Sequence, residues 1–112
     1  MLTIYHNPRC SKSRQTLQLI EAASAEHQVV EYLKTPLNET ELRQLAAKLG
    51  VAPIDMMRTK EAEFKEQALK DANDDALFTA MANTPKLMER PIVVNAEQAV
   101  IGRPPENVNT LL

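Results

Sequence analysis

The single cysteine of this chain, Cys10, lies in a strongly cationic segment, "YHNPRCSKSR" at residues 5–14. Basic residues occur on both sides of it, at Arg9, Lys12 and Arg14, and the segment contains no acidic residue. Cysteine reacts as the thiolate, and nearby cations favour that form over the neutral thiol. The residue types therefore predict an activated thiol rather than an inert buried cysteine.

The ionisation of Cys10 requires help from its neighbours. An ordinary thiol with a pKa of about 8.5 is only about 3% ionised at pH 7, and lowering the pKa by about two units requires roughly 2.7 kcal/mol. The N-terminus of a helix supplies only about 0.3–1 kcal/mol of this. The flanking cations are the first candidates for the remainder, and His6 and Ser13 lie close enough in sequence to donate hydrogen bonds. His6 has an equally plausible structural role at the end of a strand.

Two related chemistries are inconsistent with the residues that follow Cys10. A low-molecular-weight tyrosine phosphatase loop requires an arginine at the position of Thr16. Dithiol chemistry of the C-x-x-C type requires a second cysteine at the position of Ser13. Cys10 thus has no resolving partner within the chain, and any disulfide that it forms must involve another molecule. The sequence implies an external reductant.

Three arginines further along the chain are candidates for binding an anion. Arg58 ends the segment "PIDMMR", Arg90 precedes a predicted strand, and Arg103 follows another. Residues at strand ends and in crossover loops can converge on one edge of a sheet, and guanidinium groups bind tetrahedral oxyanions well. Spacing alone leaves a solvated surface role open for each of them.

The elements that must position these residues alternate between strand and helix. Residues 2–6 predict a buried strand, a helix follows from Ser11 to about residue 26, and residues 29–33 predict a second strand. This is the length of a strand–helix–strand unit. Two strands at 91–94 and 99–102 then form a hairpin, and Pro105 begins a last helix.

The intervening residues are predominantly helical. Asn38 and Gly50 are typical caps of a helix between them, Pro53 begins a further turn, and two weakly amphipathic helices are predicted within 59–90 before Pro85 ends the second. The chain is therefore predicted to be a single α/β domain over residues 1–112. It would contain a four-stranded mixed sheet flanked by helices, with a helical insertion at about 38–88.

Composition limits the classes of partner. A chain of 112 residues with a net charge of −2 lacks the basic face that nucleic acid binding requires. No segment resembles a signal peptide or a membrane span, and a lone cysteine suits a reducing compartment. We expect a cytoplasmic protein with no membrane partner.

Four segments, "YHNPRCSKSRQTL", "MMRTKE", "ERPIVV" and "IGRPPE", resemble in order the signature segments of the glutaredoxin-coupled arsenate reductase (ArsC) family. The resemblance extends from residue 2 to residue 112. It implies a thioredoxin-like fold with a helical insertion and a cis peptide bond before Pro91.

The resemblance also implies roles for the candidate residues. Cys10 would be the nucleophile that attacks arsenate, His6 and Ser13 would tune its thiolate, and the oxyanion would be bound by Arg58, Arg90 and Arg103. Glutathione would then attack the arsenic adduct and arsenite would leave. Glutaredoxin would resolve the mixed disulfide between Cys10 and glutathione. Glutathione is thus expected as a co-substrate, with no bound cofactor or metal.

Two alternatives remain open from the sequence. One is glutathione-linked thiol exchange on another substrate, because Arg9, Ser11 and Lys12 flank Cys10 where family members carry small residues. The extra positive charge could recruit a different anion, or the carboxylates of glutathione. The other is an Spx-like regulatory protein that binds RNA polymerase, and the missing C-x-x-C motif counts against it.

Overall fold

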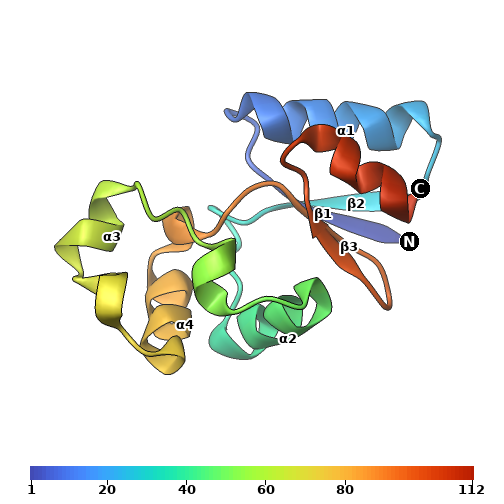
Figure 1. Cartoon of the computed structure of the whole chain (residues 1–112). Helices are drawn as coiled ribbons and strands as arrows, with labels where there is room; N and C mark the ends of the chain where they lie inside the picture. The colour runs from blue at the N-terminus through green and yellow to red at the C-terminus, as the bar shows by residue number, and fades with distance from the viewer. The chain divides into compact units, whose positions relative to one another are not determined.

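The computed structural model describes residues 1–112 and divides the chain into two compact units. The sheet unit comprises residues 1–35 and 90–112, and the helical unit comprises residues 36–89. Figure 1 shows the elements of both. None of the helices has the length and apolar character needed to cross a membrane.

The sheet unit contains all four strands: β1 (Leu2–His6), β2 (His27–Glu31), β3 (Ile92–Val94) and β4 (Ala99–Ile101). Their order in the sheet is β2-β1-β3-β4. β1 pairs in parallel with β2 and antiparallel with β3, and β3 pairs antiparallel with β4. The mixed four-stranded sheet that the sequence predicts is confirmed.

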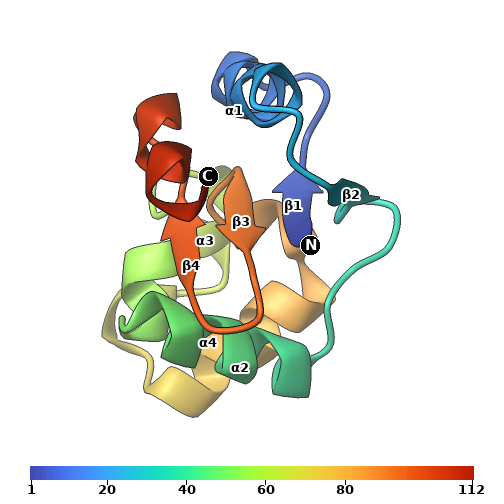
Figure 2. The ribbon, with the colours of Figure 1, turned by 90° about the vertical axis from the view of Figure 1, so that its right-hand side faces the viewer.

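Two helical elements cover one face of this sheet. Helix α1 (Ser11–Ala22) and the 3₁₀ helix η4 (Pro105–Leu111) contact each other and lie side by side on that face (Figures 1 and 2). Alternate residues of β1 are buried because side chains on a strand alternate between faces. The core beneath the helices consists of Leu2, Ile4, Ile20, Val93 and Val108. His6 follows the same alternation and is also buried.

Helix α1 ends earlier than the sequence predicts. Ser24 adopts a left-handed φ of 54°, and the backbone N–H groups of Ser24 and Ala25 donate to Glu21 O and Ile20 O. This pair of bonds is a Schellman motif, which usually has glycine at the left-handed position. Because serine occupies it here, the sequence lacked the usual stop signal. The chain then enters β2 at His27, two residues before the predicted start.

Both connections beside the C-terminal strands contain a cis peptide bond. The bond between Arg90 and Pro91 is cis, which confirms the expectation from the resemblance. The bond between Arg103 and Pro104 is also cis, which was not predicted. The final helix begins at Pro105 as predicted and is a 3₁₀ helix throughout.

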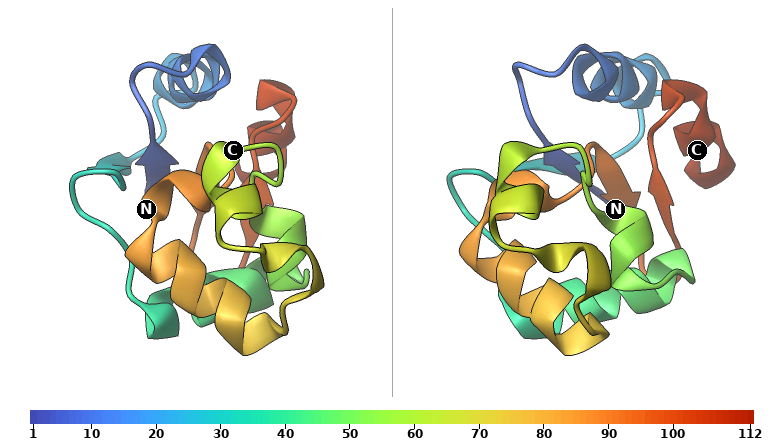
Figure 3. Two further views of the ribbon diagram at one scale, coloured as in Figure 1. Left: turned by 90° about the vertical axis from the view of Figure 1, so that its left-hand side faces the viewer. Right: turned by 60° about the vertical axis from the view of Figure 1, so that its left-hand side comes forward.

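The helical unit contains three α-helices and three 3₁₀ turns (Figure 3). These are α2 (Glu39–Leu49), η1 (Pro53–Met56), α3 (Ala62–Glu66), η2 (Leu69–Asp71), α4 (Asp74–Asn83) and η3 (Pro85–Leu87). The caps of α2 are as predicted: Asn38 forms a capping box with Glu41, and Gly50 ends the helix with a φ of 71°. α2 packs against α4.

The first helix predicted within 59–90 is shorter than expected. α3 covers only residues 62–66 because Ala68 takes a left-handed φ of 53°, and the chain continues as the short turn η2. α4 ends at Asn83 and Pro85 begins η3, so proline marks the stop as predicted.

Candidate active site

Cys10 is the N-cap residue of α1, directly after the turn that follows β1. Its backbone N–H donates to Asn7 O at 3.0 Å, and its own carbonyl accepts from the N–H of Arg14 at 3.0 Å. These two bonds fix Cys10 where the unpaired N–H groups of the first helical turn are concentrated. Its side chain is largely buried, with a residue exposure of 9%. The helix N-terminus therefore holds the sulfur, as the sequence predicted.

The surroundings of Cys10 favour the thiolate. Burial raises the pKa of the Cys10 thiol, but the Ser13 N–H, the Arg90 guanidinium, the Lys12 N–H and Arg103 all lower it. The lowering contributions prevail, so the pKa of Cys10 lies below its ordinary value. Hydrogen bonds and positive charge both stabilise the ionised form. The predicted activation of this thiol has a physical basis in the fold.

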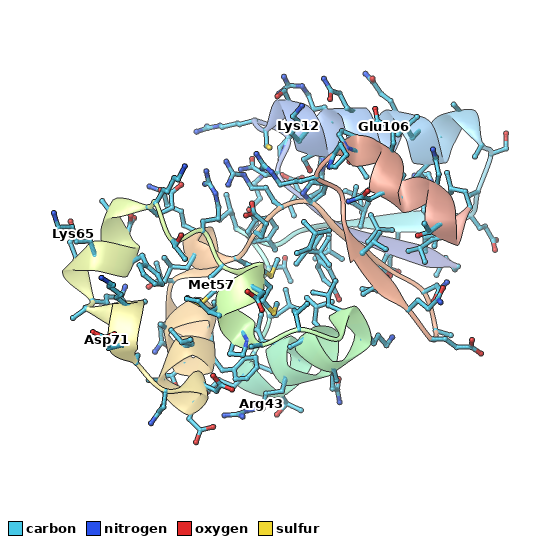
Figure 4. All side chains as sticks on the ribbon, in the orientation of Figure 1. Lys12, Arg43, Met57, Lys65, Asp71 and Glu106 are labelled. Atoms are coloured by element: carbon cyan, nitrogen blue, oxygen red, sulfur yellow. The ribbon has the colours of Figure 1, made fainter.

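The cations that act on the sulfur are not the ones closest in sequence. Arg9, Lys12 and Arg14 all have exposed side chains. Lys12 extends from the first turn of α1 (Figure 4), and the guanidinium of Arg14 donates to Pro8 O at 2.9 Å. Lys12 contributes through its backbone N–H, and the charge comes from Arg90 and Arg103.

Sheet topology brings those two arginines to Cys10. The antiparallel pairing of Tyr5 with Ile92, and of Ile92 with Ile101, aligns the end of β1 with the start of β3 and the end of β4. Cys10 follows the end of β1, Arg90 precedes the start of β3, and Arg103 follows the end of β4. The guanidinium Nη1 of Arg103 donates to the carbonyl of Arg90 at 3.1 Å, which ties the two segments together.

His6 and Ser13 form a buried pair beside the cysteine. His6 Nδ1 lies 2.6 Å from Ser13 Oγ, and the same oxygen accepts the N–H of Asn7 at 3.1 Å. Burial lowers the pKa of His6, Glu31 raises it and Arg14 lowers it, for a net decrease. Burial therefore favours the neutral form of the imidazole. The pair links the end of β1 to the first turn of α1, and its influence on the thiolate remains a prediction.

Arg58 belongs to the helical unit, whereas the other five candidate residues belong to the sheet unit. Its N–H donates to Leu87 O at 2.7 Å, beside an isolated bridge between Met57 and Met88. Its guanidinium forms an ion pair with Glu61. Arg58 is thus held in place by its own unit.

Other features of the chain add no further thiol chemistry. No group of three or more histidine, cysteine, aspartate or glutamate side chains is arranged to hold a metal ion. The helical unit contains a cavity of about 540 Å³, which the sequence did not predict. Its lining is formed by Ile54, Thr59, Phe64, Lys65, Ala68, Leu69 and Lys70.

Comparison with known proteins gives consistent matches over both units. A model of the ArsC family matches residues 5–111, a range that includes all six candidate residues. An arsenate reductase of Neisseria meningitidis serogroup A is 46% identical over 114 residues, with 99% of this chain and 97% of that protein covered. The uncharacterised protein YfgD of Escherichia coli K12 is 52% identical over 108 residues, with 94% and 91% covered. The structure of an arsenate reductase from Vibrio cholerae has a TM-score of 0.95 and 52% identity, with 99% and 97% covered.

Proposed function

Because the chain belongs to the ArsC family and has its thioredoxin-like fold, we propose that it reduces arsenate to arsenite through Cys10. Glutathione and a glutaredoxin are the proposed external reductants. The observation that carries the proposal is a lone thiol whose pKa is lowered in part by Arg90 and Arg103. Similarity to relatives named arsenate reductase supports the choice of substrate.

The first proposed step forms a bond between sulfur and arsenic. The Cys10 thiolate attacks arsenate, and one arsenic–oxygen bond breaks as that oxygen takes up protons and leaves as water. Arsenic remains in the +5 state at this stage. Guanidinium groups bind oxyanions through charge-assisted hydrogen bonds, and this suits Arg90 and Arg103 to hold arsenate against the sulfur. Arg58 is the third member of the proposed oxyanion-binding set.

The second proposed step transfers electrons. The glutathione thiolate attacks the Cys10 sulfur of the adduct, and a disulfide forms as the sulfur–arsenic bond breaks. The bonding pair stays on arsenic, which leaves as arsenite in the +3 state. A glutaredoxin thiolate then takes the glutathione moiety and releases Cys10. A thiolate with a lowered pKa is a good leaving group in such exchanges. The activation of Cys10 thus assists both its attack and its release.

The proposed roles of the other residues follow from their contacts. His6 and Ser13 hold the strand end and the first helical turn together, so that the Ser13 N–H can act on the sulfur. We propose no bound cofactor or metal, because glutathione supplies the electrons as a co-substrate. Dependence on reduced glutathione fits a cytoplasmic location.

A coupled assay tests the proposal. Purified protein is mixed with arsenate, glutathione, a glutaredoxin, glutathione reductase and NADPH, and NADPH oxidation is followed. We expect arsenate-dependent oxidation that disappears in Cys10→Ala and persists in Arg9→Ala, which changes an exposed flanking cation. No arsenate-dependent turnover, together with rapid glutathionylation of Cys10, would instead favour glutathione-linked thiol exchange. Co-purification with RNA polymerase would favour an Spx-like role.

A further inference from the structure

Gly102 lies where the loop after β4 meets helix α1. Resting on the proposed function, we propose that Gly102 is a positioning residue of the active site. Its lack of a side chain lets the loop that carries Arg103 lie directly against the helix that holds Cys10. This contact sets the separation of the Cys10 thiolate from Arg90 and Arg103.

The space around Gly102 is too small for any side chain. A Cβ atom there would lie 2.6 Å from Thr16 Oγ1, 2.8 Å from Pro91 Cγ and 3.1 Å from Thr16 Cγ2. Distances below 3.0 Å require something to shift. Thr16 is completely buried within α1, and the ring of Pro91 is rigid. The φ angle of Gly102 is not in the left-handed region, so the requirement is for space and not for an unusual backbone conformation.

The same contact joins the segments that act on the sulfur. Thr16 Oγ1 donates to Lys12 O at 2.8 Å and lies 3.5 Å from Gly102 O. Lys12 belongs to the helical turn whose N–H groups lower the pKa of Cys10. The N–H of Gly102 donates to Pro91 O at 2.9 Å, directly after Arg90. Thr16, Pro91 and Gly102 are therefore each close in sequence to one group that stabilises the thiolate.

The loop is also held by η4. Asn107, in η4, donates through Nδ2 to Ile101 O at 3.1 Å and to Arg103 O at 3.2 Å, the residues before and after Gly102. An added Cβ at Gly102 would have to displace helix α1 or this loop, and moving the loop would strain these bonds.

The test is Gly102→Ala, with the pKa of Cys10 measured from the pH dependence of its alkylation by iodoacetamide. We expect that pKa to rise by about half a pH unit or more, because the arginines act less strongly at greater separation. The KM for arsenate should rise by about threefold or more, with a smaller change in kcat, since the same guanidinium groups are proposed to bind substrate. Alkylation needs no arsenate, so an inactive wild-type protein would refute the proposed function without affecting this measurement.

Two further variants separate positioning from a general loss of stability. Gly50→Ala alters the only other glycine, whose Cβ would meet no atom within 4 Å. Because Gly50 has a φ of 71°, the Gly50→Ala backbone is strained, but the variant should leave the pKa of Cys10 unchanged. The double variant Thr16→Ala/Gly102→Ala removes two of the three close contacts and should recover part of the shift.

A folded Gly102→Ala protein with the wild-type Cys10 pKa would overturn the proposal. So would a double variant whose Cys10 pKa is no closer to the wild-type value than that of Gly102→Ala. If Gly102→Ala does not fold, Asn107→Ala provides the test, because Asn107 is exposed and its replacement only frees the loop. A smaller rise in the pKa of Cys10 is expected there, and no rise would overturn the proposal.

Discussion

The two units of the chain use their arginines in opposite ways. In the helical unit the guanidinium of Arg58 is paired with Glu61. In the sheet unit Arg90 and Arg103 lower the pKa of Cys10. Arg58 is thus paired with a carboxylate, whereas the charges of Arg90 and Arg103 act on a nucleophile.

Further pairs extend the charge compensation in the helical unit. Lys86 lies 3.5 Å from Glu61 Oε2 and 3.3 Å from Glu63 Oε2. The backbone N–H of Glu63 itself, and then Lys86, lower the pKa of the Glu63 carboxyl. In turn Glu63, and then Glu61, raise the pKa of Lys86. Arg90 and Arg103 are among the groups that lower the pKa of Cys10, and Arg58 is not. This difference ranks Arg90 and Arg103 above Arg58 in their effect on the thiol.

The largest effect is expected from removing an arginine of the sheet unit. Arg90→Ala and Arg103→Ala should each reduce kcat/KM for arsenate by about tenfold or more, the scale of one charge-assisted contact to the reacting group. Each should also raise the pKa of Cys10, because each charge stabilises the thiolate. Steady-state kinetics and iodoacetamide alkylation measure the two effects. Arg103→Lys is the control, since it keeps the charge and loses the planar fork. An unchanged Cys10 pKa in both alanine variants would contradict the role of these two arginines in stabilising the thiolate.

Arg58→Ala should separate substrate binding from thiol activation. We expect a loss of about tenfold in kcat/KM if Arg58 contacts the oxyanion, and no change in the pKa of Cys10. Glu61→Gln is the matched variant, because it removes the carboxylate and leaves Arg58 in place. It should retain activity and lower the KM for arsenate slightly. A rise in the pKa of Cys10 in Arg58→Ala, as large as that in Arg90→Ala, would contradict the ranking.

The parts of this molecule that were predictable from sequence are those set by local interactions. The strand at 2–6 has the expected bounds, because it combines apolar, β-branched and aromatic residues and Pro8 follows closely. The caps of α2 are set by residues within one turn of each end. Placement of Cys10 at a helix N-terminus belongs to the same class. All three depend on contacts between neighbours in the chain.

The remaining features depend on contacts that a sequence pattern does not contain. Serine and alanine take left-handed conformations at Ser24 and Ala68, where glycine would have signalled the end of a helix. The choice between flanking and remote cations at Cys10 required the strand order, because Arg90 and Arg103 reach it only through β1, β3 and β4. The need for glycine at position 102 appears only when Thr16 and Pro91 are in place.

A smaller effect is expected on stability as the pH changes. The pKa of Cys10 is lower in the folded chain than in the unfolded chain, so unfolding takes up a proton at intermediate pH. The resulting stabilisation is fully present above the ordinary thiol pKa of about 8.5 and is lost as pH falls through the folded pKa. Urea unfolding under reducing conditions measures the free energy of unfolding of wild type and Cys10→Ser. The difference between them should grow in favour of wild type from about pH 6 to about pH 9.

His6 provides a check on this pH dependence. Burial lowers the pKa of His6, so His6 also makes the folded state more stable as pH rises. This effect is present in both proteins and largely cancels when their free energies of unfolding are subtracted. A difference between wild type and Cys10→Ser that does not change with pH would mean that the folded chain does not favour the thiolate. The contrast between the two units would then lose its basis.

The smallest effect on chemistry is expected from a change confined to the helical unit. Asn38→Ala removes the side-chain oxygen that accepts the N–H of Glu41 at 2.8 Å, and such caps contribute about 1 kcal/mol. We expect urea unfolding to show a loss of that size, and Asn38→Asp to retain most of the stability. The pKa of Cys10 should not change, because every group that lowers it lies in the sheet unit. A folded Asn38→Ala protein with an altered Cys10 pKa would show that the helical unit also controls the thiolate, and the charge of Arg58 would then need to be counted with those of Arg90 and Arg103.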